Sequence, residues 1–317
     1  MAAHYLDFER PIADIESKIE ELDRLRETAG SEGFEAEIET MRARARELRA
    51  EAYQNLDTWQ KTQVARHPQR PHFVRYLEGL IEDFVELRGD RTFADDQAIL
   101  GGLGRFKGQP VVVMGHEKGH DVATRIKHNF GAARPEGYRK AERLMDLAER
   151  FGLPVLSFID TGGAYPGVGG EERGQAEAIA RSTERCLTLK VPMIATVTGE
   201  GGSGGALAIA AGNKVLMLEH SVYAVASPEA SAGIIYRDRA YAAQTARSMK
   251  ISAQELLAQR VIDRIIPEPP GGAHAEPEVA IASVGDAVEE ELRGLSSLSP
   301  TELRRQRTDR YLAIGRP

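Results

Sequence analysis

The sequence predicts an α/β fold with a mainly parallel sheet, and three observations support this class. Short apolar runs typical of buried strands alternate with amphipathic helical segments between residues 98 and 266. Parallel strands are apolar throughout because helices cover both faces of their sheet. Two of the apolar runs end in glycine-rich segments, at 160–170 and 197–206, which lead directly into helices. The 317 residues suffice for one large α/β domain with extensions.

Composition excludes several classes of function. The formal net charge of −7 argues against general nucleic-acid binding. The chain shows no signal peptide and no run of about 18 apolar residues, so we expect a cytoplasmic protein without a membrane segment. The single cysteine, Cys186, excludes a disulfide framework within the chain and a cysteine-based zinc site. Its place beside leucines in a helical pattern predicts a buried core residue.

Residues 1–60 are predicted to form an N-terminal helical hairpin. Apolar residues recur at spacings of three and four on both sides of a turn signal at 28–33, namely Ile12, Ile15, Ile19, Leu22 and Leu25, and then Ile38, Met41, Ala45, Leu48 and Ala52. We interpret the hairpin as a docking arm for a partner subunit. The alternative is a helical flap that packs on its own domain.

Residues 61–97 are predicted to hold a linker and a helix. The linker at 64–75 contains two prolines, a helix is expected from Tyr76 to Leu87, and residues 88–91 interrupt it with a turn.

The core is predicted to span residues 98–283. A hairpin turn at 107–110 joins strands at 98–106 and 111–116. Helices are expected at 136–151, where Gly152 and Pro154 mark the end, and at about 171–189. Further strands are expected at 155–159, 191–197, 214–218 and 222–226, and a capping box at 252–255 opens a helix that precedes the run at 261–266. A loop at 267–280 leads to C-terminal helices at 284–317, where Arg304, Arg305, Arg307 and Arg310 are expected to face solvent.

The glycine segment at 197–206 is the most informative feature of the chain. A strand end, a stretch of nearly bare backbone and a helix N-terminus together present several unpaired N–H donors at one point. Such a point holds a phosphate, or an oxyanion that develops during a reaction. The glycine segment at 160–170 follows the preceding strand, and a right-handed crossover would bring the two segments to one pocket. The alternative is that these glycines serve chain reversal alone.

Other interpretations of these residues stay open. The spacing Gly199-x-Gly201-x-x-Gly204 matches the dinucleotide fingerprint, with Glu219 about twenty residues on, but only the nine residues 205–213 separate it from the next strand. A P-loop is excluded because no Gly-Lys-Ser/Thr ends the segment.

The sequence also offers candidate catalytic residues for two other enzyme classes, a serine hydrolase and a hydratase. Ser203 lies in a Gly-x-Ser-x-Gly pentad, with His220 and Asp263 as conceivable partners of a serine hydrolase. A hydratase would need positioned carboxylates, for which Glu171 and Glu172 are candidates.

Taken together, the motifs resemble one known family. The matching segments are LDFERPI at 6–12, ARHPQRP at 65–71, GH-x-KG at 115–119, PEGYRKA at 135–141, GAYPG at 163–167, EERGQ at 171–175, GEGGSGGALA at 199–208 and IPEP at 266–269. In these the chain resembles the carboxyltransferase α subunit of bacterial acetyl-CoA carboxylase, within the crotonase superfamily. The resemblance covers nearly the whole chain. It implies a crotonase-like spiral of strand–strand–helix units, with the N-terminal hairpin and C-terminal helices added.

The resemblance also implies a reaction and its partners. Carboxybiotin on a biotin carboxyl carrier protein would donate its carboxyl group to acetyl-CoA, giving malonyl-CoA in the first committed step of fatty acid synthesis. An α₂β₂ assembly is implied, in which the β subunit carries a four-cysteine zinc ribbon. Biotin carboxylase completes the ATP-dependent complex. No cofactor would be bound covalently to this chain, and no metal is expected in it. Propionyl-CoA or a longer acyl-CoA is the alternative substrate, and a non-catalytic scaffold is a rival of another class.

The family motifs assign roles to residues of this chain. Gly204 and Gly205 would donate backbone N–H groups to the oxyanion, and Gly162 and Gly163 are possible second donors. Biotin- or CoA-binding roles fall on a further set of side chains, namely Lys118, Arg139, Lys140, Tyr165 and Glu200. Two departures alter these expectations: Gly162 stands where many members have proline, and Ala230 and Ser231 replace a common Gly-Cys pair.

Overall fold

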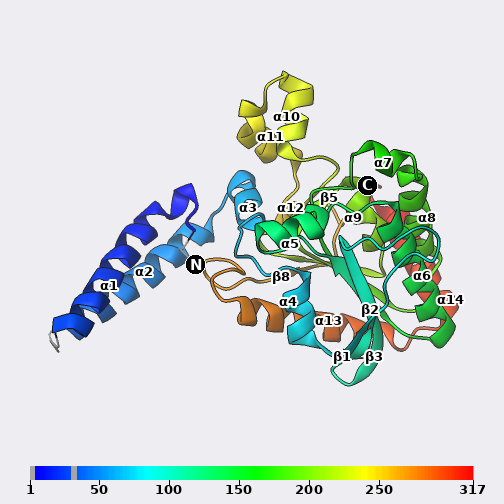
Figure 1. Ribbon diagram of the computed structural model, residues 1–317, viewed down its shortest axis with the longest axis horizontal. Helices are drawn as coiled ribbons and strands as arrows, with labels where there is room; N and C mark the ends of the chain where they lie inside the picture. The colour runs from blue at the N-terminus through cyan, green and yellow to red at the C-terminus, as the bar shows by residue number, and fades with distance from the viewer. Residues whose placement is uncertain (1–3, 30–33, 317) are drawn as a thin grey trace.

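A mixed sheet forms the centre of the molecule (Figure 1). The computed structural model describes residues 4–29 and 34–316, and eight strands occur in this part of the chain. The order is β1-β2-β3-β4-β5-β6-β8, and β7 pairs with the carboxyl end of β5. The strands are β1 (Ile81–Glu86), β2 (Ile99–Phe106), β3 (Gln109–His116), β4 (Val155–Thr161), β5 (Met193–Gly202), β6 (Lys214–Leu218), β7 (Val222–Ala224) and β8 (Arg264–Ile266).

The sheet is antiparallel at one edge and parallel elsewhere. β1, β2 and β3 pair antiparallel, whereas β3 with β4, β4 with β5, β5 with β6 and β6 with β8 are parallel. The predicted turn between β2 and β3 is a two-residue loop at Lys107 and Gly108, whose φ angles of 46° and 80° suit the right-handed twist of a hairpin. The mainly parallel pairing predicted from the apolar runs is confirmed.

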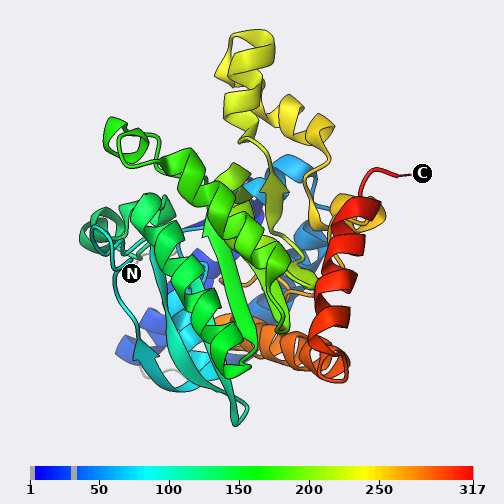
Figure 2. The same cartoon turned by 90° about the vertical axis from the view of Figure 1, so that its right-hand side faces the viewer.

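Helices cover both faces of the sheet (Figure 2). One face packs on α6 (Pro135–Phe151), α8 (Gln175–Thr188) and α9 (Ser203–Ala210), with Met114, Leu144 and Val197 in that core. The other packs on α4 (Phe73–Leu80) and α13 (Pro277–Leu295), around Phe158, Leu216 and Val284. Each such side chain contributes about 1.5–3 kcal/mol on burial. Cys186 lies in the first core as expected, and burial raises the pKa of its thiol to about 12.

The N-terminal helices form an arm that extends from the sheet (Figure 1). After the short turn η1 (Asp7–Glu9), α1 (Arg10–Ala29) and α2 (Glu35–Gln54) pack side by side through Ile12, Ile19 and Ile38. An ion pair between Arg42 and Asp23 at 2.9 Å joins them. The two predicted helices are confirmed, while most of their predicted connecting turn, residues 30–33, lies outside the described residues.

Short helices complete the fold, and one group projects from it. They are α3 (Thr58–Ala65), α5 (Val122–Lys127), η3 (Asn129–Gly131), α7 (Val168–Glu171), α10 (Pro228–Tyr236), η4 (Arg239–Tyr241), α11 (Ala242–Met249), α12 (Ala253–Ala258) and α14 (Pro300–Ala313). The α10–α11 pair stands away from the sheet as a separate lobe (Figures 1 and 2). In the described ranges, no helix combines the length and apolar character needed to cross a membrane.

Several predicted elements are wrong in extent. The helix expected at 76–87 ends at Leu80, and Ile81–Glu86 forms edge strand β1, because these residues find a pairing partner in β2. The helix expected at 171–189 is broken at Gly174, which has a φ of 78°. The tail helix α13 begins at Pro277, inside the predicted loop. The predicted helix at 136–151 is confirmed, and Gly152 ends it in the left-handed conformation.

Arg307 corrects the expectation that the C-terminal arginines face solvent. Its side chain on α14 is fully buried. The guanidinium donates to the carbonyl oxygens of Cys186 and Val191, each at 2.9 Å, and also to the side-chain oxygen of Asn213. Burial without a carboxylate partner lowers the pKa of Arg307 to about 10. The periodicity of a helix shows which residues share a face, but not that another segment covers it.

Candidate functional site

The two glycine segments meet at the carboxyl ends of β4 and β5, as the sequence predicted. A Cβ placed on Gly202 would lie 2.3 Å from the carbonyl carbon of Gly162. A Cβ on Gly205 would lie 2.6 Å from the backbone nitrogen of Ala164. Both distances are shorter than any real contact of a Cβ, so glycine is required for the two backbones to approach this closely. Close packing therefore explains these two glycines without any role in chemistry.

The turn within the segment at 197–206 is shorter than the glycine content of the segment suggests. Strand β5 continues to Gly202, and α9 begins at Ser203. The reversal falls on Ser203, whose φ of 55° is unusual for a residue with a side chain. Residues 199–201, which were expected in the turn, are part of the strand.

The N-terminus of α9 presents donors at this turn. Its cap residue is Gly202, which has no side chain that could accept a hydrogen bond from the first turn of the helix. The first N–H groups of an α-helix have no partner within the helix, and those of Gly204 and Gly205 belong to this set. The N–H of Gly163 donates to the hydroxyl of Thr161 at 3.1 Å, so it is already engaged. Gly162 is exposed, with open space around it.

Two buried polar side chains lie close to the turn, and sequence reasoning missed both. His116, at the end of β3, is wholly buried, and burial lowers its pKa to about 4, so its ring is neutral at pH 7. The hydroxyl of Tyr138 on α6 would lie 2.9 Å from a Cβ on Gly205. Neither the His116 ring nitrogens nor the Tyr138 hydroxyl has a hydrogen-bond partner among the described residues. Both residues stand inside motifs that matched the family, but a motif does not show where a side chain points.

A network of ion pairs surrounds the end of β5, and we call it the site network. It consists of Arg66, Lys118, Asp160, Glu200 and Glu229. The Lys118 ammonium lies 2.6 Å from Asp160 Oδ1 and 3.0 Å from Glu200 Oε2. Arg66 bridges Glu200 at 2.6 Å and Glu229 at 2.5 Å. Burial by itself would raise the pKa of Glu200, but Lys118 and Arg66 outweigh it and hold that pKa below its usual range.

The other predicted ligand side chains have internal partners. Lys140 is buried and pairs with Asp95 Oδ1 at 2.6 Å, and Arg139 pairs with Asp90 at 2.8 Å. These two cations, like Lys118, are therefore engaged within the chain rather than presented to phosphate groups. Tyr165 packs beneath the Arg134 guanidinium, 4.5 Å from the ring centroid, and this contact holds the loop after Gly163.

The structure does not assemble the rival sites. Ser203 is exposed, His220 lies in a different cleft, and Asp263 accepts a hydrogen bond from the backbone N–H of Val215, so no Ser-His-Asp set forms. Glu171 and Glu172 are both exposed on the surface. Helix α9 has 8 residues, shorter than a dinucleotide-binding helix, and Glu219 accepts a hydrogen bond from the backbone N–H of Glu268.

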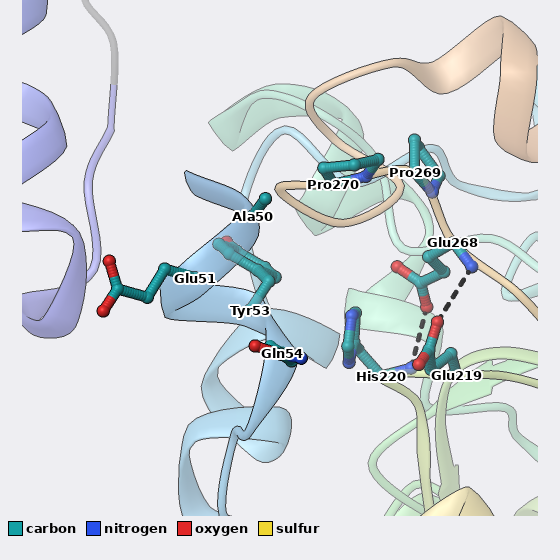
Figure 3. Close-up of a pocket in the computed structure, with 9 residues that line it drawn as sticks. All are labelled: Ala50, Glu51, Tyr53, Gln54, Glu219, His220, Glu268, Pro269 and Pro270. Carbon is teal, nitrogen blue, oxygen red and sulfur yellow. Dashed lines mark hydrogen bonds between the residues drawn. The ribbon is translucent and has the colours of Figure 1, made fainter. Parts of the chain in front are cut away.

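A cleft of about 470 Å³ lies apart from the glycine segments (Figure 3). Tyr53 and Gln54 on α2 form one side, and Glu219, His220 and Glu268 form the other. The Glu268 carboxylate and the His220 backbone N–H already have partners within the chain. Glu268 accepts a hydrogen bond from the His220 backbone N–H at 2.9 Å and forms an ion pair with Arg70. It contains no strand-to-helix turn with open donors.

One cluster has the residue types of a metal site. Glu9, His67 and His274 place donor atoms within 4.8 Å of one another, the one such group in residues 4–29 and 34–316. The rings of His67 and His274 are stacked, with centroids 3.6 Å apart and planes 19° apart. Imidazole lone pairs lie in the ring plane, so stacked rings do not direct their nitrogens to one ion.

Comparison with known sequences gives one consistent result. The family model described as acetyl co-enzyme A carboxylase carboxyltransferase-like matches residues 5–315. A relative from Caulobacter vibrioides (strain NA1000 / CB15N), named acetyl-coenzyme A carboxylase carboxyl transferase subunit alpha, is 70% identical over 316 residues, 100% of this chain and 99% of that protein. A relative of the same name from Methylobacterium nodulans is 59% identical and covers 98% of both chains.

Solved structures with the same fold are distant in sequence. A Pseudomonas malonate decarboxylase hetero-tetramer, in complex with coenzyme A, superposes with a TM-score of 0.60 at 15% identity, over 76% of this chain and 94% of that one. The β subunit of geranyl-CoA carboxylase from P. aeruginosa gives a TM-score of 0.56 at 16% identity, over 78% of this chain and 46% of that one. At these identities the likeness shows the fold alone. It confirms the predicted crotonase-like α/β class.

Proposed function

This chain belongs to the family of acetyl-CoA carboxylase carboxyltransferase alpha subunits, and we propose that its converging glycine segments stabilise the oxyanion of a biotin-dependent carboxyl transfer. In this proposal the chain acts with a β subunit to move the carboxyl group of carboxybiotin to acetyl-CoA, giving malonyl-CoA. The carboxybiotin is a substrate carried on a separate protein, so the chain itself needs no bound cofactor.

One observation carries the proposal. The uncapped N-terminus of α9 lies directly beside the 162–164 segment, so the N–H groups of the first helical turn lie next to a loop whose Gly162 is exposed. The N–H groups of Gly204 and Gly205 would stabilise the negative charge that develops on the ureido oxygen as CO₂ leaves. The biotin itself would then take the proton from the acetyl methyl group, and the resulting enolate would attack the CO₂ to form malonyl-CoA. This fits a site in which Ser203 has no base beside it, and one lost donor would lower the rate about 10²–10³-fold.

The partners form the second part of the proposal. We propose an α₂β₂ assembly in the cytoplasm, in which the β subunit holds zinc and shares the active site, alongside the biotin carrier and biotin carboxylase. The hairpin arm would dock a partner subunit. Its projection from the core supports this role, because α1 and α2 extend away from the sheet rather than lying over it (Figure 1).

The reverse reaction tests the function directly. Malonyl-CoA-dependent carboxylation of free biotin is measured with this chain alone, with the β subunit alone and with the verified complex. We expect turnover only from the complex. Turnover from this chain alone would contradict a shared site, and turnover with methylmalonyl-CoA instead of malonyl-CoA would assign the substrate to a longer acyl-CoA. A verified complex that is inactive with both substrates would overturn the carboxyltransferase role.

The donor assignment has its own test at Gly162. Proline has no N–H, whereas alanine keeps it, and open space around Gly162 admits either side chain. If the Gly162 N–H is a donor, G162P lowers kcat about 100-fold while G162A retains turnover. Equal kcat values for the two variants would leave Gly204 and Gly205 as the donors.

A further inference from the structure

Strand β5 changes its neighbour along its length. Residues Ile194–Val197 pair with β6, whereas Glu200–Gly202 pair with β7. Against β4, the register runs from Ile159 opposite Val197 to Thr161 opposite Gly201, so β5 advances four residues while β4 advances two. The two extra residues make a bulge at Thr198–Glu200. A bulge bends its strand and redirects the residues after it, which here form the turn into α9.

The bulge removes backbone groups from the sheet ladder, and two buried side chains replace the missing partners. The backbone N–H of Glu200 donates to Asp160 Oδ1 at 2.9 Å. The carbonyl oxygen of Thr198 accepts from Arg70 Nε at 2.7 Å. Asp160 and Arg70 are each 2% exposed. Unpaired backbone groups at this depth would be costly, so these two side chains stabilise the irregular strand.

Both side chains are held ionised by their own partners. Lys118 lies 2.6 Å from Asp160 Oδ1, and His72 lies 3.2 Å from Asp160 Oδ2. Burial by itself would raise the pKa of Asp160, but Lys118, His72 and the Glu200 N–H together outweigh it and hold that pKa well below its usual range. Arg70 binds both oxygens of Glu268, at 2.6 and 2.8 Å.

The bulge and Asp160 also interlock sterically. A Cβ on Gly199 would lie 2.4 Å from Asp160 Oδ1. The glycine at 199 therefore makes room for the carboxylate, and the carboxylate in turn fills the space beneath the bulge.

We infer that Asp160 and Arg70 are positioning residues of the carboxyltransferase site. They hold the bulge that turns β5 from β6 toward β7, and this turn sets the direction of the Gly204 and Gly205 N–H groups. The inference rests on the proposed function for its catalytic consequence, but its structural part stands on the bulge alone. Neither residue needs to touch the substrate.

The experiment compares D160A with D263A in the assembled complex. Asp263 is a matched control, because it also accepts a strand N–H, that of Val215 at 2.7 Å, and also binds an arginine, Arg310. It lies at the amino end of β6, away from the glycine segments. Displacing the donors by about 1 Å is expected to lower kcat of the reverse reaction about 100-fold in D160A. KM for malonyl-CoA should change less than about threefold, and D160N, which keeps an acceptor for Glu200, should recover part of kcat.

Hydrogen exchange separates this inference from the proposed function. Amide exchange in the peptide covering 198–210 should accelerate in D160A and R70K but not in D263A. If the wild-type complex has no turnover, the proposed function fails, and exchange still decides whether Asp160 holds the bulge. Should D160A not assemble, R70K and D160N supply both measurements. Unchanged exchange at 198–210, or a kcat for D160A equal to that of D263A, would overturn the inference.

Discussion

Two buried polar regions lie near the carboxyl edge of the sheet, and different kinds of group hold them together. The site network joins five ionised side chains around the end of β5. The hairpin junction, which consists of Glu9, Tyr53, His67, His220 and His274, ties the arm to the core. There the Tyr53 hydroxyl donates to Glu9 at 2.7 Å, Tyr53 meets the His220 ring edge-on, and His67 stacks on His274.

The two regions differ in how their protonation responds to pH. Burial lowers the pKa of His67 and of His274, the latter to about 3, so both rings are neutral at pH 7. Around them lie His4, Arg49, Arg70 and Glu268. In the site network, burial acts against ionisation, but Lys118 together with His72 at Asp160 and with Arg66 at Glu200 holds the pKa of both carboxyls below the usual range. Between about pH 6.5 and 5 the site therefore keeps its charges, whereas the junction loses stability because the unfolded chain binds protons more readily than the buried rings do.

The largest expected effect comes from removing one ion of the site network. The Lys118 side chain is only 15% exposed. K118M therefore removes a largely buried cation and leaves the carboxylates of Asp160 and Glu200 without it. We expect a loss of about 3–5 kcal/mol in the free energy of unfolding, measured by urea denaturation. The control is K107M, whose lysine pairs with Asp286 and Glu289 on the surface and should cost under about 1 kcal/mol. Equal losses would show that the network is no more than surface pairing.

Acid titration should separate the two regions next. The folded pKa of His274 lies below the value of about 6.5 in an unfolded chain, so the unfolded state binds a proton first as pH falls. The stability it contributes is present above pH 6.5 and is lost toward the folded pKa. Between pH 6.5 and 5 we expect a loss of about 1–2 kcal/mol for this histidine.

The H274Q variant should flatten that pH dependence, as measured by urea midpoints across the same range. The exposed His120 provides the control, because H120Q should leave the slope as in the wild type. A slope that H274Q leaves unchanged would show that the junction does not titrate as argued.

A smaller effect is expected from the hydroxyl of Tyr53. Y53F leaves one buried oxygen of Glu9 without its donor, which should lower the free energy of unfolding by about 1–2 kcal/mol. Y5F makes the matched comparison, since Tyr5 donates to Glu16 at 2.5 Å on a less buried part of the arm. Thermal unfolding measures both, and a larger loss for Y5F would contradict the central place of Tyr53 in the junction.

The smallest effect concerns backbone strain. Both regions use left-handed backbone, but the junction places glycine there, at Gly272 with φ of 82°, whereas the site places Ser203 at 55°. S203G should stabilise the fold by up to about 1 kcal/mol, as relief of strain exceeds the added chain entropy. S203A keeps the strain and should not stabilise, and G272A should destabilise. Stabilisation by S203A as well would assign the effect to the hydroxyl.

The glycine segments show how far sequence reasoning reached into the site. Gly162, Gly202 and Gly205 could be placed together because their strands are consecutive, parallel and joined by a crossover of fixed hand. The roles of Asp160, Arg70 and His116 were missed, although Asp160 is the first residue of the glycine segment at 160–170. An acidic residue at a strand end can serve many roles. Nothing in the local sequence indicates that an oxygen of Asp160 accepts the backbone N–H of Glu200 in the neighbouring strand, in place of a partner in the sheet.

The sequence by itself determined the fold class, the helical hairpin and the pair of glycine segments, because apolar period and glycine spacing are local properties of the chain. Tertiary structure alone decided the bulge in β5, the internal pairing of Lys118 and Lys140, and the burial of Arg307. Each depends on contacts between distant segments, as when Arg70 meets Glu268 across 198 residues. Whether a charged side chain faces water or a buried partner is set by what covers it, and that information lies elsewhere in the chain.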